Sequence, residues 1–349
     1  MCIRDRISYH ALALRLLTGH GYSFDTGWYP FTPANTPTAH WSFAYSTYLA
    51  GVYGVFGVHP LAARLIQAAL VGAATCFLVY SLTRRVFGAR ADLVAAGIAA
   101  VYTYFVYYSA ALMTESFFMV AALAGLEMGQ RLLEKPSAGR AALLGLSLGL
   151  AVLLRQAILV FIPVLLAWLW WEGRRRLRWQ HYLIPLAVVA LLIAPWTLRN
   201  YRVYGRFLLL NSNAGYAFYS SNNPALGVYW LSENSVAPVP TDLQGRNEAE
   251  MDSALMQRGI GFILADPGRY ALLTLSRTKE YFKFWPSSDS SLVSNLQRPL
   301  SFGLLLPPVS YTPLTLPTSD LVQISVVAVS LKKKQNTTQK ARATKIVQN

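Results

Sequence analysis

The stretch Ala110-Ala111-Leu112-Met113-Thr114-Glu115-Ser116-Phe117-Phe118 places one carboxylate between two long apolar runs. Each run, 93–112 and 117–130, is close to the roughly 20 residues that an α-helix needs to cross a bilayer. A carboxylate at such a depth is costly to bury, so it usually marks a pathway or a reaction site. Glu115 is therefore the first candidate functional residue, and the side of the membrane that it faces decides its partners.

The composition agrees with a membrane protein. The 349 residues are 54% hydrophobic and only 13% charged, whereas a soluble domain carries about 25% charged residues. The apolar residues come in long blocks, which predicts an all-α, multi-pass integral membrane protein. The formal net charge is +15, but much of it lies in short loops between apolar runs, as in cytoplasmic membrane loops. We therefore expect membrane lipids, and no nucleic acid, among the partners.

The two ends look foreign to this pattern. Residues 1–6 resemble a translated sequencing adapter, and the segment at 309–318 resembles read-through into the opposite adapter, followed by a polar tail to residue 349. We exclude 1–6 and 309–349 from the fold. The remainder, 7–308, is expected to be an internal piece of a longer protein, and we expect this truncated chain to be inactive.

The native part divides into four segments. Residues 7–60 predict a first extracytoplasmic loop with short helices at 7–18 and 43–56. Residues 61–198 predict a bundle of transmembrane helices. Residues 199–297 predict an extracytoplasmic segment with amphipathic helices, and 298–308 would open a truncated span. The expected spans within the bundle are 61–82, 91–112, 117–133, a hairpin of two short helices over 141–171 that turns near 154–156, and 182–198.

Basic residues set the orientation of these spans. The loops at 84–90, 131–140 and 172–179 are rich in arginine and lysine, so they should be cytoplasmic. Alternation of the spans then places Glu115, Arg155, Arg199 and the first loop on the outer face. This convergence of ionic groups on one face is the strongest functional signal in the sequence.

Each charged candidate also has a plain structural explanation. Glu115 could offset the dipole of its own helix, with Thr114 as the N-cap. Arg155 lies within an apolar run, where it either binds an anion such as a lipid-linked phosphate or extends its guanidinium to the headgroups. Arg199 and Arg64 lie near helix ends, where such snorkelling costs little, and for Arg64 we favour that explanation.

Polar residues in the loops are weaker candidates. His10, His20 and His40 lie among aromatic residues, and a lone loop histidine is usually just solvated. Asn222, before Asn223 and Pro224, is most often part of a turn. The histidines form no metal cluster, and Cys2 and Cys76 have neither disulfide nor metal-ligand spacing.

Several short motifs occur in an order typical of one family. The chain resembles the dolichyl-phosphate-mannose–protein mannosyltransferase-like membrane glycosyltransferases of the GT-C fold, which include bacterial lipid A and polysaccharide glycosyltransferases. The likeness covers most of 7–270. It rests on Tyr9-His10-Ala11-Leu12-Ala13, Gly19-His20-Gly21, Pro37-Thr38-Ala39, Leu61-Ala62-Ala63-Arg64-Leu65, Thr114-Glu115, Leu154-Arg155, Pro195-Trp196-Thr197-Leu198-Arg199-Asn200-Tyr201, Asn213-Ala214-Gly215 and Asn222-Asn223-Pro224.

The resemblance implies a hexosyl- or pentosyltransferase. Its donor would be a polyprenyl-phosphate sugar, and its acceptor a lipid, glycan or protein at the outer face of the bacterial cytoplasmic (inner) membrane. No cofactor is certain, and a divalent cation is the one candidate. The alternative function is a multi-pass transporter or flippase of a lipid-linked or small anionic substrate, for which clear inverted repeats are lacking. A structural or assembly role would leave Glu115 and Arg155 unexplained.

The resemblance also assigns roles to residues. The family's first-loop acid, four residues before the tyrosine matched by Tyr9, corresponds to Asp5, which lies in the adapter-like segment. Glu115 corresponds to the second outer acid, and these two are the catalytic candidates. The candidate substrate-binding residues are Tyr9, His40, Arg64, Arg155, Arg199, Asn200 and Asn222. Of these, Arg155 and Arg199 would contact phosphate, and His40 stands where the family often has an Arg-Pro or Lys-Pro pair.

Overall fold

A computed structural model describes residues 2–28, 30–227, 237–282, 285–288, 290, 292–299 and 303. The chain divides into two compact units, 1–282 and 283–349. The described part is helical and contains two isolated β-bridges, Ser23–Pro37 and Trp28–Thr32, in the first loop. In the second unit, α13 (Leu292–Arg298) is held to the preceding turn by Asn295, whose amide donates to the Ser287 carbonyl at 2.8 Å.

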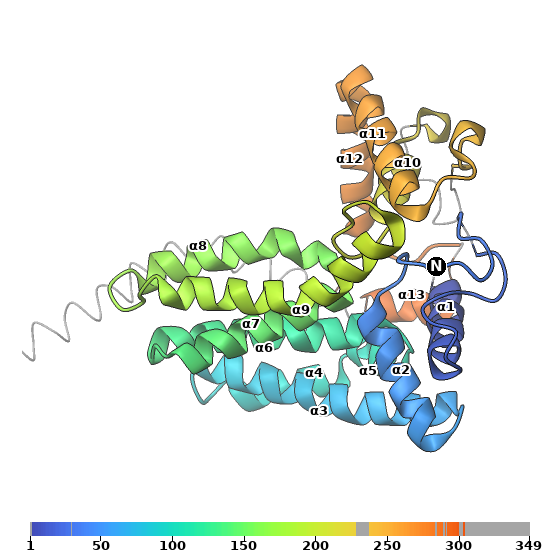
Figure 1. Ribbon diagram of the computed structural model, residues 1–349. Helices are drawn as coiled ribbons and strands as arrows, with labels where there is room; N and C mark the ends of the chain where they lie inside the picture. The colour runs from blue at the N-terminus through green and yellow to red at the C-terminus, as the bar shows by residue number, and fades with distance from the viewer. Residues whose placement is uncertain are drawn as a thin grey trace, which may run out of the picture. The chain divides into compact units, whose positions relative to one another are not determined.

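A bundle forms the larger part of the first unit. Its helices lie alongside one another, with α3 against α4 and α6, and α7 between α6 and α9 (Figure 1). The bounds are α3 (Pro60–Phe87), α4 (Asp92–Val101), α5 (Thr103–Ala110), α6 (Thr114–Glu134), α7 (Ala138–Leu154), the 3-10 helix η1 (Gln156–Val160), α8 (Phe161–Gly173) and α9 (Gln180–Tyr204).

In the part of the chain that the structure describes, three helices are long and apolar enough to cross a membrane: α3, the continuous helix formed by η1 and α8, and α9. The bent pair α4–α5 adds a fourth span if the two helices are counted together. Helix α6, which we expected to be a span over 117–133, does not qualify; it carries Glu115, Glu127, Arg131 and Glu134. Helix α7, 17 residues long, is apolar but short. The multi-pass architecture is confirmed, with fewer unbroken spans than the sequence predicted.

The expected span at 91–112 is broken. Helices α4 and α5 meet at Tyr102, whose ψ of 115° is extended, and the two axes differ by 56°. The amide of Gln67, buried in α3, satisfies the backbone beyond the break, donating to the carbonyl of Ser109 at 3.1 Å and of Ala111 at 2.6 Å. A buried carbonyl without a partner would cost free energy, so Gln67 stabilises the end of the broken helix.

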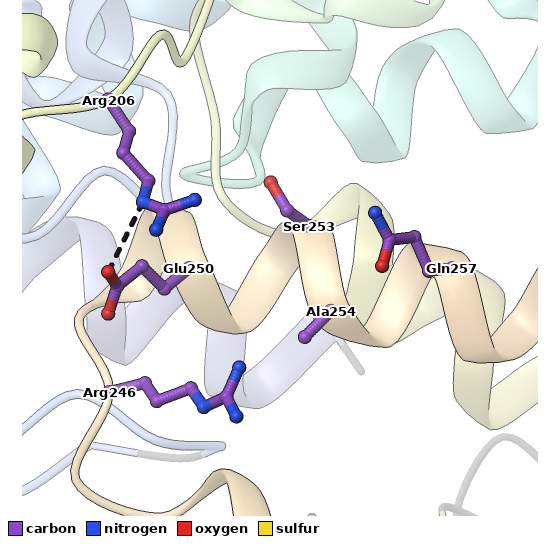
Figure 2. Close-up of a pocket in the computed structure, with 6 residues that line it drawn as sticks. All are labelled: Arg206, Arg246, Glu250, Ser253, Ala254 and Gln257. Atoms are coloured by element: carbon purple, nitrogen blue, oxygen red, sulfur yellow. Dashed lines mark ion pairs between the residues drawn. The ribbon is translucent and has the colours of Figure 1, made fainter.

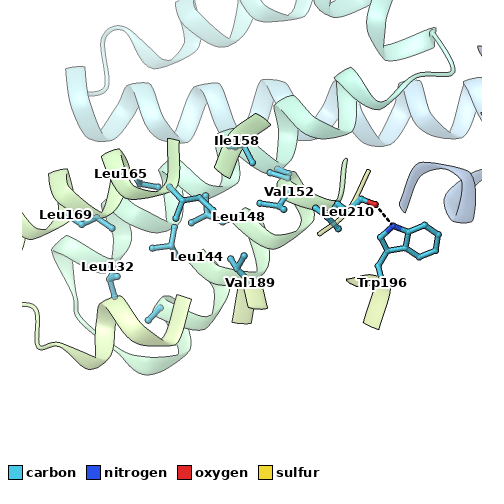
Figure 3. Close-up of a cluster of buried hydrophobic side chains, with 14 of the residues drawn as sticks. Leu132, Leu144, Leu148, Val152, Ile158, Leu165, Leu169, Val189, Trp196 and Leu210 are labelled. Carbon is cyan, nitrogen blue, oxygen red and sulfur yellow. Dashed lines mark hydrogen bonds between the residues drawn. The ribbon is translucent and has the colours of Figure 1, made fainter. Parts of the chain in front are cut away.

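The core of the bundle lies between α6, α7, α8 and α9 (Figure 3). Glycines bring α7 and α9 close: a Cβ atom at Gly145 would lie 2.8 Å from the Cα atom of Pro185. Trp196 closes one end of this core, where its indole nitrogen donates to the carbonyl of Leu210 at 3.2 Å. The labelled members of the cluster are Leu132, Leu144, Leu148, Val152, Ile158, Leu165, Leu169, Val189, Trp196 and Leu210.

The shorter helices gather at one end of the bundle (Figure 1). Helices α1 (Cys2–Leu17) and α2 (Phe43–Phe56) pack on each other, and so do α10 (Ala214–Asn222) and α11 (Glu248–Ala265), with α12 (Pro267–Tyr281) after them. Asn247 and Asp266 cap α11 and α12 by accepting backbone N–H groups. The adapter-like residues 2–6 are part of α1. The expected span at 298–308 and the tail at 309–349 lie almost entirely outside the described residues.

An ionic cluster holds α3 to α6 away from this end. The buried carboxylate of Glu127 accepts from Arg85 at 2.9 Å, from Arg131 at 2.6 Å and from Ser81 at 2.6 Å. Arg85 also contacts Glu134 at 2.6 Å. Glu127 and Arg131 form an i,i+4 pair within α6, whereas Arg85 adds a contact between helices that the sequence did not reveal.

Candidate functional site

Glu115 and Arg155, 40 residues apart in sequence, form an ion pair. The Nη2 atom of Arg155 lies 3.0 Å from Oε1 of Glu115. Glu115 is in the first turn of α6, and Arg155 is the extended residue that ends α7, so two helix ends bring them together. Their side chains are 21% and 46% exposed. A pair this accessible is weak, so either group can exchange its partner for a substrate.

Gln67 forms hydrogen bonds that support the backbone next to Glu115. Besides the Ala111 carbonyl, the amide of Gln67 contacts the hydroxyl of Ser116 at 3.1 Å, and its oxygen accepts from the Tyr45 hydroxyl at 2.8 Å. Thr114 is not the expected N-cap. It is the first residue of α6, where Met113 is the N-cap without a side-chain bond, and the Thr114 hydroxyl lies 3.4 Å from the Glu115 carboxylate.

Aromatic side chains pack next to the ion pair. The ring of Tyr9 lies edge-on to Trp41 at 5.6 Å and to Tyr45 at 4.9 Å. This cluster includes Leu112 and packs against Leu154, which are close neighbours in sequence of Glu115 and Arg155. Tyr9, a predicted substrate-binding residue, is buried in this cluster. Glu115 and Arg155 therefore lie beside an aromatic wall formed by Tyr9, Trp41 and Tyr45.

The segment 38–42 lies along this aromatic wall and is held at both of its ends by hydrogen bonds. The Ala39 N–H donates to Glu248 at 2.7 Å, and the Ser42 hydroxyl donates to the carbonyl of Leu153 at 2.7 Å. Between these two contacts, the buried ring nitrogens Nδ1 of His40 and Nε1 of Trp41 have no hydrogen-bond partner among the described residues. A buried polar atom without a partner is uncommon, so these two ring nitrogens are candidate partners for polar atoms of a ligand.

Burial also sets the charge of His40. It lowers the pKa of this imidazole from 6.5 to about 4, against the opposing influence of the Glu248 carboxylate. His40 is therefore neutral at neutral pH, with one ring nitrogen that donates and one that accepts. It can bind hydroxyl groups, but it does not supply the positive charge of the Arg-Pro or Lys-Pro pair expected at that position.

Glu248 is a buried acid that the sequence analysis missed. It accepts hydrogen bonds from the hydroxyl of Thr32 at 2.6 Å, of Ser212 at 2.8 Å and of Tyr204 at 3.2 Å, besides that from the Ala39 N–H. These donors belong to the first loop, to α9 and to the segment after it. No local pattern marks them, because 216 residues separate Glu248 from Thr32. Glu248 thus joins the outer segment to the loop that carries His40.

Arg199 and Asn200 also connect α9 to its surroundings. Arg199 donates to the carbonyl of Thr38 at 2.9 Å and lies over the ring of Trp196 at 4.6 Å. The buried amide of Asn200 donates to the carbonyl of Leu210 at 2.8 Å, and its oxygen accepts from Arg199. Arg199 supports the segment 38–42 directly, and Asn200 does so through Arg199. Neither is part of the Glu115–Arg155 pair.

The other predicted site residues lie apart from the pair. Arg64, in the first turn of α3, is exposed and has no ion pair among the described residues. Asn222 ends α10, where its buried amide donates to the carbonyl of Phe218 at 2.8 Å and its Oδ1 atom has no partner among the described residues. Asp5 lies one helical turn before Tyr9 in α1, and its side chain is not described.

A metal site is not assembled by the described side chains. Among them, no group of three or more histidine, cysteine, aspartate or glutamate residues is close enough to share an ion. The candidate divalent cation therefore has no three-ligand protein site in this part of the chain.

Comparison with known proteins supports the resemblance. Residues 35–198 match the family described as dolichyl-phosphate-mannose-protein mannosyltransferase. The match covers segment 38–42, Arg64, Glu115 and Arg155, and it ends just before Arg199 and Asn200. No curated protein and no solved structure matches the chain significantly. Over these residues the chain is similar to this family of membrane glycosyltransferases of the GT-C type.

Proposed function

We propose that this protein transfers a sugar from a polyprenyl-phosphate donor to a lipid, glycan or protein acceptor at the outer face of the bacterial cytoplasmic membrane. The observation that carries the proposal is the accessible pair of Glu115 and Arg155, placed at two helix ends beside the aromatic wall of Tyr9, Trp41 and Tyr45. A base and a cation within 3.0 Å of each other are the two groups that such a transfer requires.

The roles follow from the chemistry of the groups. The planar fork of Arg155 suits a phosphate oxyanion, so the donor phosphate replaces the Glu115 carboxylate at the guanidinium. The freed carboxylate accepts the proton of the acceptor hydroxyl. The acceptor oxygen then bonds to the anomeric carbon while the bond from that carbon to the phosphate oxygen breaks. Polyprenyl phosphate is the leaving group, and the guanidinium of Arg155 balances its negative charge. This displacement needs no nucleophile from the protein.

Other residues would bind rather than react. His40 and Trp41 offer their unpartnered ring nitrogens to sugar hydroxyls, and the ring of Trp41 offers a face for stacking. Arg199 and Asn200 would act through segment 38–42, which Arg199 contacts at Thr38. Asp5 shares a face of α1 with Tyr9 and is the second candidate base. Arg64 and Asn222 would lie at the edge of the substrate path.

The Glu115 carboxylate and the donor phosphate compete for Arg155, so substitutions of Glu115 and Arg155 should change donor affinity in opposite directions. We expect Glu115→Gln to tighten the binding of polyprenyl-phosphate mannose several-fold, because Arg155 loses its protein partner, while transfer falls by at least about 100-fold. Arg155→Gln should weaken donor binding by about tenfold or more. Binding is measured by microscale thermophoresis in neutral detergent and transfer with radiolabelled donor, both on the protein made from the completed reading frame, since the truncated chain is expected to be inactive.

Glu134→Gln is the matched control, since Glu134 belongs to the ionic cluster at Glu127, away from the proposed site. It should leave donor binding and transfer unchanged. Undiminished transfer by Glu115→Gln would remove Glu115 from the reaction, and unchanged donor binding by Arg155→Gln would remove Arg155. Counterflow of a solute in liposomes without sugar transfer would instead support a transporter.

A further inference from the structure

We propose that a cavity on the exposed side of α11 binds a phosphate-bearing sugar. The cavity has a volume of about 300 Å³ (Figure 2). This is at the lower end of the range found for small-molecule sites. Its lining is Arg206, Arg246, Glu250, Ser253, Ala254 and Gln257.

Four of the lining residues form one stripe of a single helix. Glu250, Ser253, Ala254 and Gln257 follow the spacing i, i+3, i+4, i+7, so they share a face of α11. Glu248, near the start of the same helix, is buried against the first loop instead. Glu248 thus fixes the start of α11, while the polar face that begins at Glu250 remains accessible.

The two arginines give this face an unbalanced positive charge. Arg206 contacts Glu250 at 3.2 Å, with side chains 61% and 31% exposed, so water weakens this pair. Arg246 is exposed and has no ion pair or hydrogen bond among the described residues. Figure 2 shows the two arginine side chains on either side of Glu250. One carboxylate facing two guanidinium groups leaves room for one more negative charge.

The polar lining selects the chemistry of the ligand. Ser253 and Gln257 offer a hydroxyl and an amide, which both donate and accept hydrogen bonds, while Ala254 is the one apolar lining residue. An acyl chain would leave these polar groups without partners. A guanidinium fork matches the geometry of a phosphate, and hydroxyl groups of a sugar match the serine and glutamine. A sugar phosphate satisfies both parts of the cavity.

The position of the cavity relates it to the membrane. Arg206 follows Gly205, the left-handed residue that ends α9, which is long and apolar enough to cross a bilayer. The phosphate sugar can therefore come from a lipid headgroup or from a glycan. Glu248 connects α11 to segment 38–42, which lies beside the proposed reaction site. We therefore assign the sugar phosphate to a part of the acceptor that lies away from the reacting hydroxyl. That last assignment rests on the proposed function, whereas binding itself does not.

Calorimetry with α-glucose 1-phosphate tests the cavity in the full chain, purified in neutral detergent. We expect this probe to bind, and glucose at the same concentration not to bind. Arg246→Gln should weaken binding by about tenfold, and Glu250→Gln should strengthen it by releasing Arg206. Arg175→Gln, an equal loss of charge in the exposed loop after α8, is the control and should bind like the unmodified chain.

Two results would overturn the proposal: no binding of glucose 1-phosphate by the unmodified chain, or equal binding by Arg246→Gln in a preparation with unchanged thermal unfolding. Competition by phosphatidylcholine vesicles containing phosphatidic acid would identify the source as a lipid headgroup, and lack of competition as a glycan. Binding of this probe at the proposed reaction site would be lost in Arg155→Gln, whereas binding at the cavity would be lost in Arg246→Gln, so a failure of the proposed reaction is distinguishable from a failure of this site.

Discussion

Polar side chains fix the geometry of the proposed site, and they differ in how visible they are in the sequence. Glu115 and Arg155 stand out because each is a charge near or within an apolar run, and the structure brings them to 3.0 Å. Gln67 and Glu248 do not stand out: one is a neutral residue within a long apolar helix, and the other begins a helix of ordinary amphipathic pattern. Their importance comes from partners in distant segments, which no local pattern records.

Asp252 provides a prediction about pH. Burial raises the pKa of this carboxyl from 3.8 to about 6, against the opposing hydrogen bond from the backbone N–H of Gly215. The folded chain therefore holds this proton up to about pH 6, whereas the unfolded chain releases it near pH 4. The contribution of Asp252 to stability is present below about pH 4 and is lost as the pH rises through 6.

Asp252→Asn keeps an acceptor for Gly215 and removes the titration. We expect the variant to unfold at the same temperature as the parent near pH 4 and at a higher temperature at pH 7, where the difference is roughly 1–3 kcal/mol. Thermal unfolding in detergent across this range measures it. A difference between Asp252→Asn and the parent that does not change with pH would contradict the prediction.

At the scale of helices, apolar patterning and turn residues gave most of the arrangement. The helix at 43–56 has its expected bounds, the segment 199–297 contains helices as expected, and the turn at 154–156 separates α7 from η1. The break at Tyr102 was not predictable, because neither proline nor glycine lies at this position. The carbonyl groups of Ser109 and Ala111, at the end of α5, depend on Gln67, which is 42 and 44 residues away from them.

The close approach of α7 and α9 predicts unequal effects of two glycine substitutions. A Cβ atom at Gly145 would lie 2.8 Å from both the Cα atom and the carbonyl oxygen of Pro185, which are backbone atoms that cannot move aside cheaply. At Gly139, in the same helix, nothing lies within 4 Å. We expect Gly145→Ala to destabilise the fold by about 1–3 kcal/mol and Gly139→Ala to be neutral or mildly stabilising.

Thermal unfolding of the two variants in the same detergent measures this difference. The two substitutions add the same methyl group to the same helix, so the effect of helix propensity is shared and only the contact with α9 differs. Equal unfolding temperatures for Gly145→Ala and Gly139→Ala would show that α7 and α9 are not packed as closely as described.

For the whole molecule, composition was sufficient to predict a helical membrane protein, and ordered motifs were sufficient to predict the family that matches 35–198. The way the outer segment is attached was not predictable. It depends on Glu248 meeting the first loop and α9, and a single sequence carries no information on such long-range pairings. The face of the membrane also remains a prediction, since it rests on the distribution of basic residues.

Cysteine labelling tests that orientation. In a chain with Cys2 and Cys76 replaced by serine, we expect a membrane-impermeant maleimide to label Thr241→Cys in intact spheroplasts, because this exposed residue lies in the outer segment. Arg175→Cys, in the basic loop after α8, should be labelled only after permeabilisation. Labelling of both cysteines in intact cells, or of Arg175→Cys alone, would place the Glu115–Arg155 pair on the wrong side for the proposed reaction.

The four hydrogen bonds that Glu248 accepts have a consequence for chimeras made from related genes. Its four donors come from Thr32, Ala39, Tyr204 and Ser212, so the carboxylate and its donors occupy three separate stretches of the gene. A chimera that grafts only the outer segment from a relative would bury a carboxylate against a loop that did not evolve with it. Crossovers should therefore keep residues 32–39 and 204–248 from the same parent, even where the helices between them are exchanged.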